Sequence, residues 1–193
     1  MSSYVSIGFV FEKDQNIKSL LSKFLDFLIT KGEFKKIAYS EDENGDKWNE
    51  KVINDYSAYM VASLMVDNYF GRTNITAAIF NDEQINLDVS IYKFPQGDFG
   101  FLIEITLEQL SKHEKKEELE KSTYRIINFC KTLFSMIEYR YAYCDQEVPI
   151  EYTWDEFNQL DKCVYSISII PHNNAIDIKL AAWDIDGLTN RLR

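Results

Sequence analysis

Cysteine, proline, glycine and histidine are all scarce in this chain of 193 residues. Its three prolines and seven glycines leave no stretch with the composition of a flexible linker. Cys130, Cys144 and Cys163 are odd in number and share no C-x-x-C spacing, which predicts free thiols in a reducing cytosol. The two histidines, His113 and His172, are far apart in sequence, whereas structural zinc usually takes its ligands in close pairs.

Signals for secretion and membrane insertion are also missing. The first residues, 1–4, lack the basic n-region of a signal peptide, and the following apolar stretch is interrupted at Glu12. The apolar helix candidates carry Lys, Asp or Glu within them, so none is expected to span a bilayer. The sequence therefore predicts a soluble, cytoplasmic protein.

No motif in the sequence supplies a catalytic site. It contains no G-x-G-x-x-G, Walker loop, G-x-S-x-G or H-E-x-x-H, and Gly97–Gly100 is too short and turn-like to cradle a phosphate. A nucleophilic Cys/His pair has no local signature either. Asp184 and Asp186 are placed to suit a divalent cation, although a solvated strand end is the simpler interpretation. We expect no catalytic residue, no metal ligand and no cofactor.

What the sequence does have is acidity and apolar bulk. The formal charge is −10, which argues against nucleic acid or an anionic membrane as a partner, because both require a cationic face. The charge either serves solubility alone or favours a basic protein partner. The apolar share is 46%, with twelve tyrosines and thirteen phenylalanines, which is ample for a core. The length predicts a single domain over residues 1–193.

Hydrophobic periodicity in the first half alternates between strands and helices. Alternation over Val5–Phe11 predicts a strand, and a helix over 16–31 follows, with Gly32 as its C-terminal cap. Residues 34–39 form a short strand, and a second helix begins at Asn49 and closes at Gly71. Three antiparallel strands follow, at 75–79, 85–91 and 99–107.

The second half begins with a long helix that Ser111 and Glu114 introduce as a capping box. A strand over 141–147 precedes a short helix from Trp154 to Leu160. The signal for that helix is a second capping box, Thr153 and Glu156, with Tyr152 and Phe157 at the staple positions. Closing strands over 163–169 and 176–182 flank a turn at 171–174. The order β-α-β-α-β-β-β-α-β-α-β-β predicts an antiparallel α+β fold, with a weak internal repeat of helix plus three strands as a hypothesis.

One segment, Tyr141 to Asp161, combines acids and aromatics without any Lys or Arg. Its acids are Asp145, Glu147, Glu151, Asp155, Glu156 and Asp161, and its aromatics are Tyr141, Tyr143, Tyr152, Trp154 and Phe157. Tyr and Trp are enriched at binding hot spots, and uncompensated acids speed association with a basic partner. Alternatively, the aromatics are core residues and the acids a solvated rim. As partner-binding residues we predict Asp145, Glu147, Glu151, Trp154, Asp155 and Glu156.

The same segment resembles bacterial polymorphic-toxin immunity proteins. The similarity lies in Tyr141–Glu147, Ile150–Tyr152, the Trp154–Phe157 helix and the closing Trp183–Thr189, and among the numbered families it points to immunity protein 64. The resemblance implies a cytosolic antitoxin that binds and blocks a cognate toxin. Such a toxin is often a nuclease with a basic groove, which an acidic inhibitor suits by imitating phosphate charge. The motifs are not catalytic.

Two other functions stay open at this point. A small-molecule or peptide-binding regulatory module would have a preformed apolar pocket between the aromatic-rich sheet and a helix. A metal-dependent hydrolase would bring two or three carboxylates together in a cleft. The sequence decides neither the toxin nor the oligomeric state.

Overall fold

The computed structural model describes residues 3–53, 55–80, 83–111, 116–160, 163–172 and 175–191. Nine strands form one sheet in the order β3-β2-β4-β5-β6-β1-β7-β8-β9, and all neighbours are antiparallel. The elements in chain order are β1 Tyr4–Phe11, α1 Ile17–Ile29, β2 Gly32–Ser40, β3 Asn49–Val52, α2 Ala58–Asp67, β4 Phe70–Ala77, β5 Ile85–Lys93, β6 Phe99–Thr106, α3 Leu107–Leu110, α4 Lys116–Phe134, β7 Tyr141–Gln146, α5 Trp154–Phe157, β8 Ile167–His172 and β9 Ala175–Leu180. The predicted α+β class is confirmed.

The first strand of the chain lies inside the sheet. β1 is flanked by β6 and β7 and pairs with β6 along its whole length. Because successive side chains point to opposite faces, Val5, Ile7 and Phe9 enter the main core, while Val10 enters a second cluster on the other face. Both faces of β1 are therefore covered, which explains why every residue after Tyr4 is buried.

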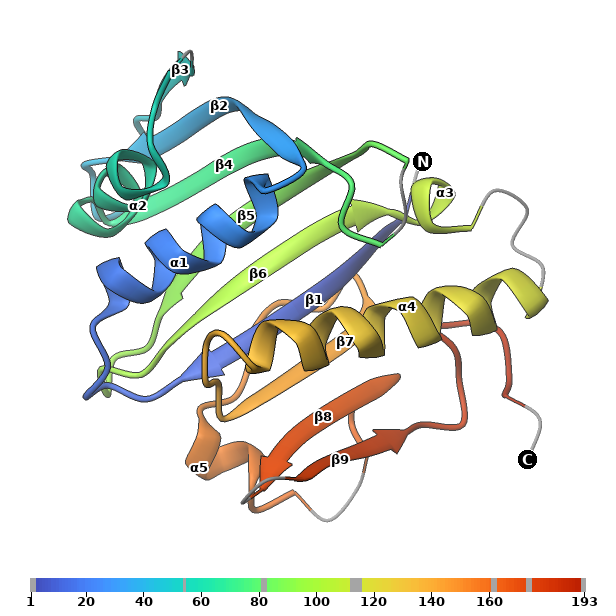
Figure 1. The fold of residues 1–193 in the computed structure, drawn as a ribbon. Helices are drawn as coiled ribbons and strands as arrows, with labels where there is room; N and C mark the ends of the chain where they lie inside the picture. Colours follow the sequence, from blue (N-terminus) through green and yellow to red (C-terminus); the bar gives the residue numbers. More distant parts are fainter. Residues whose placement is uncertain are drawn as a thin grey trace.

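One face of the sheet carries α1, α2 and α4 (Figure 1). α1 begins at the predicted place, because the Asn16 side chain accepts a hydrogen bond from Ser19 N at 2.9 Å. The apolar sides of α1 and α4 face the main core. The buried residues are Leu21, Phe24, Leu25 and Leu28 on α1 and Leu119, Ile126, Ile127, Cys130 and Leu133 on α4.

The second helix was predicted to begin too early. Asn49–Val52 is an exposed edge strand that pairs with β2, and the helix begins only at Ala58, where Ser57 Oγ accepts from Met60 N at 3.3 Å. Gly71 does not end this helix but lies in β4. An added Cβ there would stand 2.5 Å from Met65 Cα, so the glycine allows α2 to approach the strand closely. Gly32 likewise opens β2 rather than capping α1.

The predicted meander is confirmed as β4, β5 and β6, and the later strands as β7, β8 and β9, although β8 begins at Ile167 and not at Cys163. The last turn was placed too early, because Pro171 and His172 still belong to β8 and face Ile176 and Ala175 of β9. Glu114, half of the predicted capping box before α4, lies outside the described residues. α2 precedes one three-strand unit and α4 another, and the hypothesis of an internal repeat stays a prediction.

We predict that Gly8→Ala destabilises the protein by about 2 kcal/mol through overpacking. A Cβ at position 8 would lie 2.1 Å from Cε1 of Tyr143, a fully buried ring stacked against Tyr165. The matched control is Ser6→Ala on the same face of β1, since the buried Ser6 hydroxyl has no hydrogen-bond partner among the described residues. Urea unfolding should separate the two variants, and equal midpoints would contradict the packing argument.

Candidate functional site

The segment between β7 and β8 folds over the sheet face opposite the three long helices. It brings Ile150, Phe157 and Tyr165 against side chains of β1, β6, β7 and β8 in the second hydrophobic cluster. Tyr141 stacks on Phe157 with ring centroids 4.0 Å apart, and Tyr143 stacks on Tyr165 at 4.1 Å. The aromatic face of the sheet, where a regulatory module would have its pocket, is thus filled by the chain's own aromatic rings.

Two buried tyrosine hydroxyls fasten this segment to the sheet. Tyr141 Oη donates to the carbonyl of Tyr152 at 2.6 Å, and Tyr143 Oη donates to the carbonyl of Val148 at 3.0 Å. Burial raises the pKa of both hydroxyls far above the usual tyrosine range. Both groups therefore stay neutral donors, and the path of residues 148–152 across the sheet is fixed at two points.

The segment then enters α5 through the predicted capping box. Thr153 N donates to Glu156 Oε2 at 2.8 Å, and Glu156 N donates to Thr153 Oγ1 at 3.4 Å. The helix is shorter than predicted and ends at Phe157 rather than Leu160. Tyr152 and Phe157, at the staple positions, both contact Tyr165.

Trp154 occupies the first helical position and is half-buried. Its ring lies near Tyr141 and Phe157, with centroids 6.4 and 6.5 Å away. It also lines two adjoining open depressions, of about 500 and 560 Å³. We call these two depressions together the Trp154 groove.

The Trp154 groove gathers acids from four parts of the chain. They are Glu12 and Asp14 after β1, Asp98 in the β5–β6 turn, Glu138 before β7, and Asp155 and Glu156 of α5. The basic residues among its lining are Lys13, Arg140 and His172, and Arg140 already forms an ion pair with Glu12. The groove is therefore acidic around a central aromatic ring.

The structure brings only some of the predicted site residues together. Trp154, Asp155 and Glu156 lie together in the groove, and Glu151 is exposed on the segment that precedes it. Glu147 is exposed at the other end of β7, where its backbone N donates to the Tyr4 carbonyl at 3.0 Å. The length of β7, at about 3.3 Å per residue, separates Glu147 from the groove end of the strand by roughly 20 Å. Asp161 lies outside the described residues.

Asp145 is buried rather than presented on the surface, at 6% exposure. Its carboxylate accepts from Gln146 N at 2.8 Å, Ser166 N at 2.9 Å and Trp183 Nε1 at 3.2 Å. Because these donors satisfy the charge inside the protein, Asp145 joins β7 to the C-terminal segment and is not available to a partner in this conformation.

Four groove residues were not predicted from the sequence: Glu12, Asp14, Asp98 and Glu138. They come from connections far apart in the chain, and the pairing of β1 with both β6 and β7 brings those connections to one end of the sheet. No local pattern carries this information. The alternation that predicts each strand says nothing about its neighbours.

Asp184 and Asp186 form no solvated strand end, contrary to the simpler interpretation of the sequence. Asp184 is fully buried and accepts from Thr123 Oγ1 at 3.0 Å and Arg191 Nη2 at 3.1 Å. Asp186 accepts from Thr189 N at 2.9 Å and from its hydroxyl at 2.6 Å within a turn. Among the described residues no group of three His, Cys, Asp or Glu side chains is placed to hold a metal ion.

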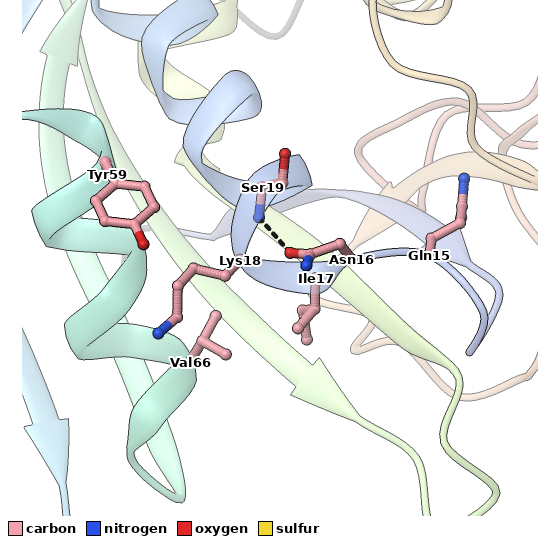
Figure 2. A pocket seen from close by; sticks show the side chains of 7 residues that line it. All are labelled: Gln15, Asn16, Ile17, Lys18, Ser19, Tyr59 and Val66. Carbon is pink, nitrogen blue, oxygen red and sulfur yellow. Dashed lines mark hydrogen bonds between the residues drawn. The ribbon is translucent and has the colours of Figure 1, made fainter.

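A further surface groove, of about 580 Å³, lies between the start of α1 and α2. Figure 2 shows Lys18 of α1 reaching toward Val66 and Tyr59 of α2, while Gln15 points away from them. Lys18 Nζ pairs with Asp67 at 2.8 Å, which holds the two helices together. The groove is open, and the cationic side chain in its lining is already paired. Its side chains therefore serve the packing of α1 against α2 and do not form a candidate catalytic site.

Comparison with known proteins identifies the family. The family model "Immunity protein 64" matches residues 1–191, so the chain belongs to that family. The resemblance inferred from the residues is thereby confirmed. No curated protein matches the chain. None of the described helices is long and apolar enough to cross a membrane.

A solved structure of a Pseudomonas aeruginosa T6SS protein is similar over 75% of this chain, at 9% identity and a TM-score of 0.37. This chain spans 42% of that protein's length. A likeness at this level carries no argument about function.

We predict that the pKa of Glu156 lies below the ordinary glutamate value and rises in Thr153→Val. The pKa is lowered by the hydrogen bond from Thr153 N and further by that from the Thr153 hydroxyl. A depressed pKa means that the capping box stabilises the fold above the ordinary glutamate pKa, and that this contribution is lost as the pH falls through the folded value.

An NMR titration of the Glu156 carboxyl carbon measures this shift. Thr153→Ser keeps the hydroxyl and should keep the low midpoint, which separates the loss of the hydrogen bond from disturbance of α5. Identical midpoints in the wild type and Thr153→Val would show that the hydroxyl contributes nothing.

Proposed function

We propose that this protein neutralises a cognate bacterial toxin by binding it, in the cytoplasm and without catalysis of its own. The family match over residues 1–191 is the observation that carries the proposal. The lack of a catalytic motif in the sequence and the absence of a metal-ligand cluster among the described residues are consistent with a binding role.

We place toxin binding at the Trp154 groove. Partly buried aromatic residues in a pocketed surface supply large contact area at low entropic cost, and Trp is among the residues enriched at hot spots. The acids around Trp154 favour a basic surface on the toxin, because complementary charge speeds encounter and disfavours wrong partners. Glu151 is exposed on the segment before α5, whereas Glu147 is at the far end of β7 and Asp145 acts inside the fold.

A nuclease is the kind of toxin that suits such a groove. Nucleases bind phosphate groups through basic side chains, and a row of carboxylates can occupy the same positions electrostatically. The proposed mode of action is thus competition for a basic substrate site, with no nucleic acid bound by the immunity protein itself. Co-expression with the cognate toxin domain is the direct test, and loss of growth despite folded immunity protein would refute the proposal.

We predict that Trp154→Ala mainly accelerates dissociation from the toxin. If Trp154 is a hot spot worth about 2 kcal/mol, the off-rate rises roughly thirtyfold, since its burial is lost only when the complex opens. The triple variant Asp14→Asn, Glu138→Gln, Asp155→Asn should instead lower the on-rate and flatten its salt dependence. All three acids are exposed, and no hydrogen bond or ion pair is seen at their carboxylates among the described residues.

The control carries the same change of charge elsewhere on the surface. Glu41→Gln, Glu43→Gln and Glu120→Gln neutralise three exposed acids outside the groove lining. Surface plasmon resonance at two ionic strengths, with circular dichroism to check folding, compares the two triple variants. Equal on-rates and equal salt slopes for both would place the binding surface elsewhere.

A further inference from the structure

β9 is the outermost strand at one end of the sheet, and no strand of the described residues pairs with the backbone groups of its outer edge. The ladder with β8 pairs Ile167 with Leu180, and one position further on Ala181 N donates to the Ser166 carbonyl at 3.1 Å. Hydrogen-bonded and non-hydrogen-bonded pairs alternate in an antiparallel ladder. Asp177 and Lys179 therefore direct their N–H and C=O groups toward β8.

It follows that Ile176, Ile178 and Leu180 direct their N–H and C=O groups outward. Pro171 fits this alternation. It has no N–H to donate, and it faces Ile176 in a pair that exchanges no hydrogen bonds. Within the described ranges no element lies beyond β9 in the sheet (Figure 1). The edge is thus a template for another strand.

The side chains of β9 divide by face. Ile178 lies opposite Ile169, which belongs to the main core, so Ile176, Ile178 and Leu180 share the helix-covered face. The two isoleucines are only partly buried, and Leu180 is 49% exposed. Asp177 and Lys179 are exposed on the opposite face. The strand thus presents an incompletely covered apolar row on one side and two opposite charges on the other.

We propose that β9 pairs antiparallel with β9 of a second copy of this chain, about a twofold axis at Ile178. This register joins the outward backbone groups of Ile178 to those of its copy, and those of Ile176 to those of the copy's Leu180. It also places Asp177 across from the copy's Lys179 twice, on the same face. Directly opposed unlike charges stabilise a strand pair, and the apolar row becomes continuous across the axis.

The charges select this partner and this register. A parallel copy in register would place Asp177 beside Asp177 and Lys179 beside Lys179. Charged residues on an edge normally discourage pairing, but here only the antiparallel copy centred on Ile178 brings the two signs together with the outward backbone groups aligned. β3, the other edge strand, has no such register, because Glu50 and Lys51 are neighbours and point to opposite faces.

Charge reversal at the two positions tests the proposal on the protein alone, without toxin. Sedimentation equilibrium of the wild type should give twice the chain mass of 22.7 kDa. Asp177→Lys and Lys179→Asp should each weaken the dimer about tenfold or more, because each opposes like charges twice. The double variant Asp177→Lys, Lys179→Asp should restore it, and an equimolar mixture of the two single variants should form a heterodimer.

Glu43→Lys makes the same charge change as Asp177→Lys at an exposed position between β2 and β3, at the opposite end of the sheet from β9, and should leave the dimer unchanged. A wild type that stays monomeric at the highest concentration tested overturns the proposal. So does a dimer that neither single variant weakens, or one that the double variant does not restore, because each result would place the contact elsewhere. None of these outcomes depends on whether the Trp154 groove binds a toxin.

Discussion

The pairing of β1 with two strands from much later in the chain is the constraint on which both layers depend. β1 joins β6 on one side and β7 on the other, so the three-strand unit β4–β6 and the unit β7–β9 become one sheet only through it. Its residues supply the main core beneath the helices and, through Gly8 and Val10, the floor of the aromatic layer. Neither layer would close around a displaced β1.

The acidity of the chain is distributed between its interior and its surface. Asp145 and Asp184 are buried and hold the C-terminal segment to β7 and α4. N–H donors satisfy the Asp145 carboxylate, whereas Asp184 Oδ1 accepts from the Thr123 hydroxyl and from Arg191, and Asp184 Oδ2 has no hydrogen-bond partner among the described residues. Buried carboxylates are tolerated when they are hydrogen-bonded or paired with a cation, as Asp145 is by its donors and Asp184 by Arg191. Two tyrosine hydroxyls and a capping box fix the segment that carries Trp154. The solvent-facing acids on this segment are therefore held in place at the groove.

Local signals predicted most of the fold. Asn16 caps α1, alternation marks β5, and the spacing of Thr153 and Glu156 predicted α5 together with the position of Trp154. β3 was missed because its residues are all exposed, so no alternation of burial marks it, and only the edge of β2 makes it a strand.

Half of the candidate site could not be predicted from local sequence patterns. Trp154, Asp155 and Glu156 follow from one short motif, whereas Glu12 and Asp98 join them through strand pairing between distant parts of the chain. Asp145 illustrates a different limit of local sequence patterns. Its place in an acidic segment suggested a surface role, and only the position of Trp183 and Ser166 in three dimensions assigns it to the interior.

The assembly of the Trp154 groove from connections has an evolutionary consequence. Its acids lie in the β1–α1 loop, the β5–β6 turn, the link before β7 and the short helix α5, and none lies within a strand. Connections tolerate substitution and changes of length better than the elements that they join. Each can therefore vary without shifting a strand register. If the toxin binds here, as we propose, this end of the molecule can diverge with its partner while the nine-stranded sheet is inherited intact.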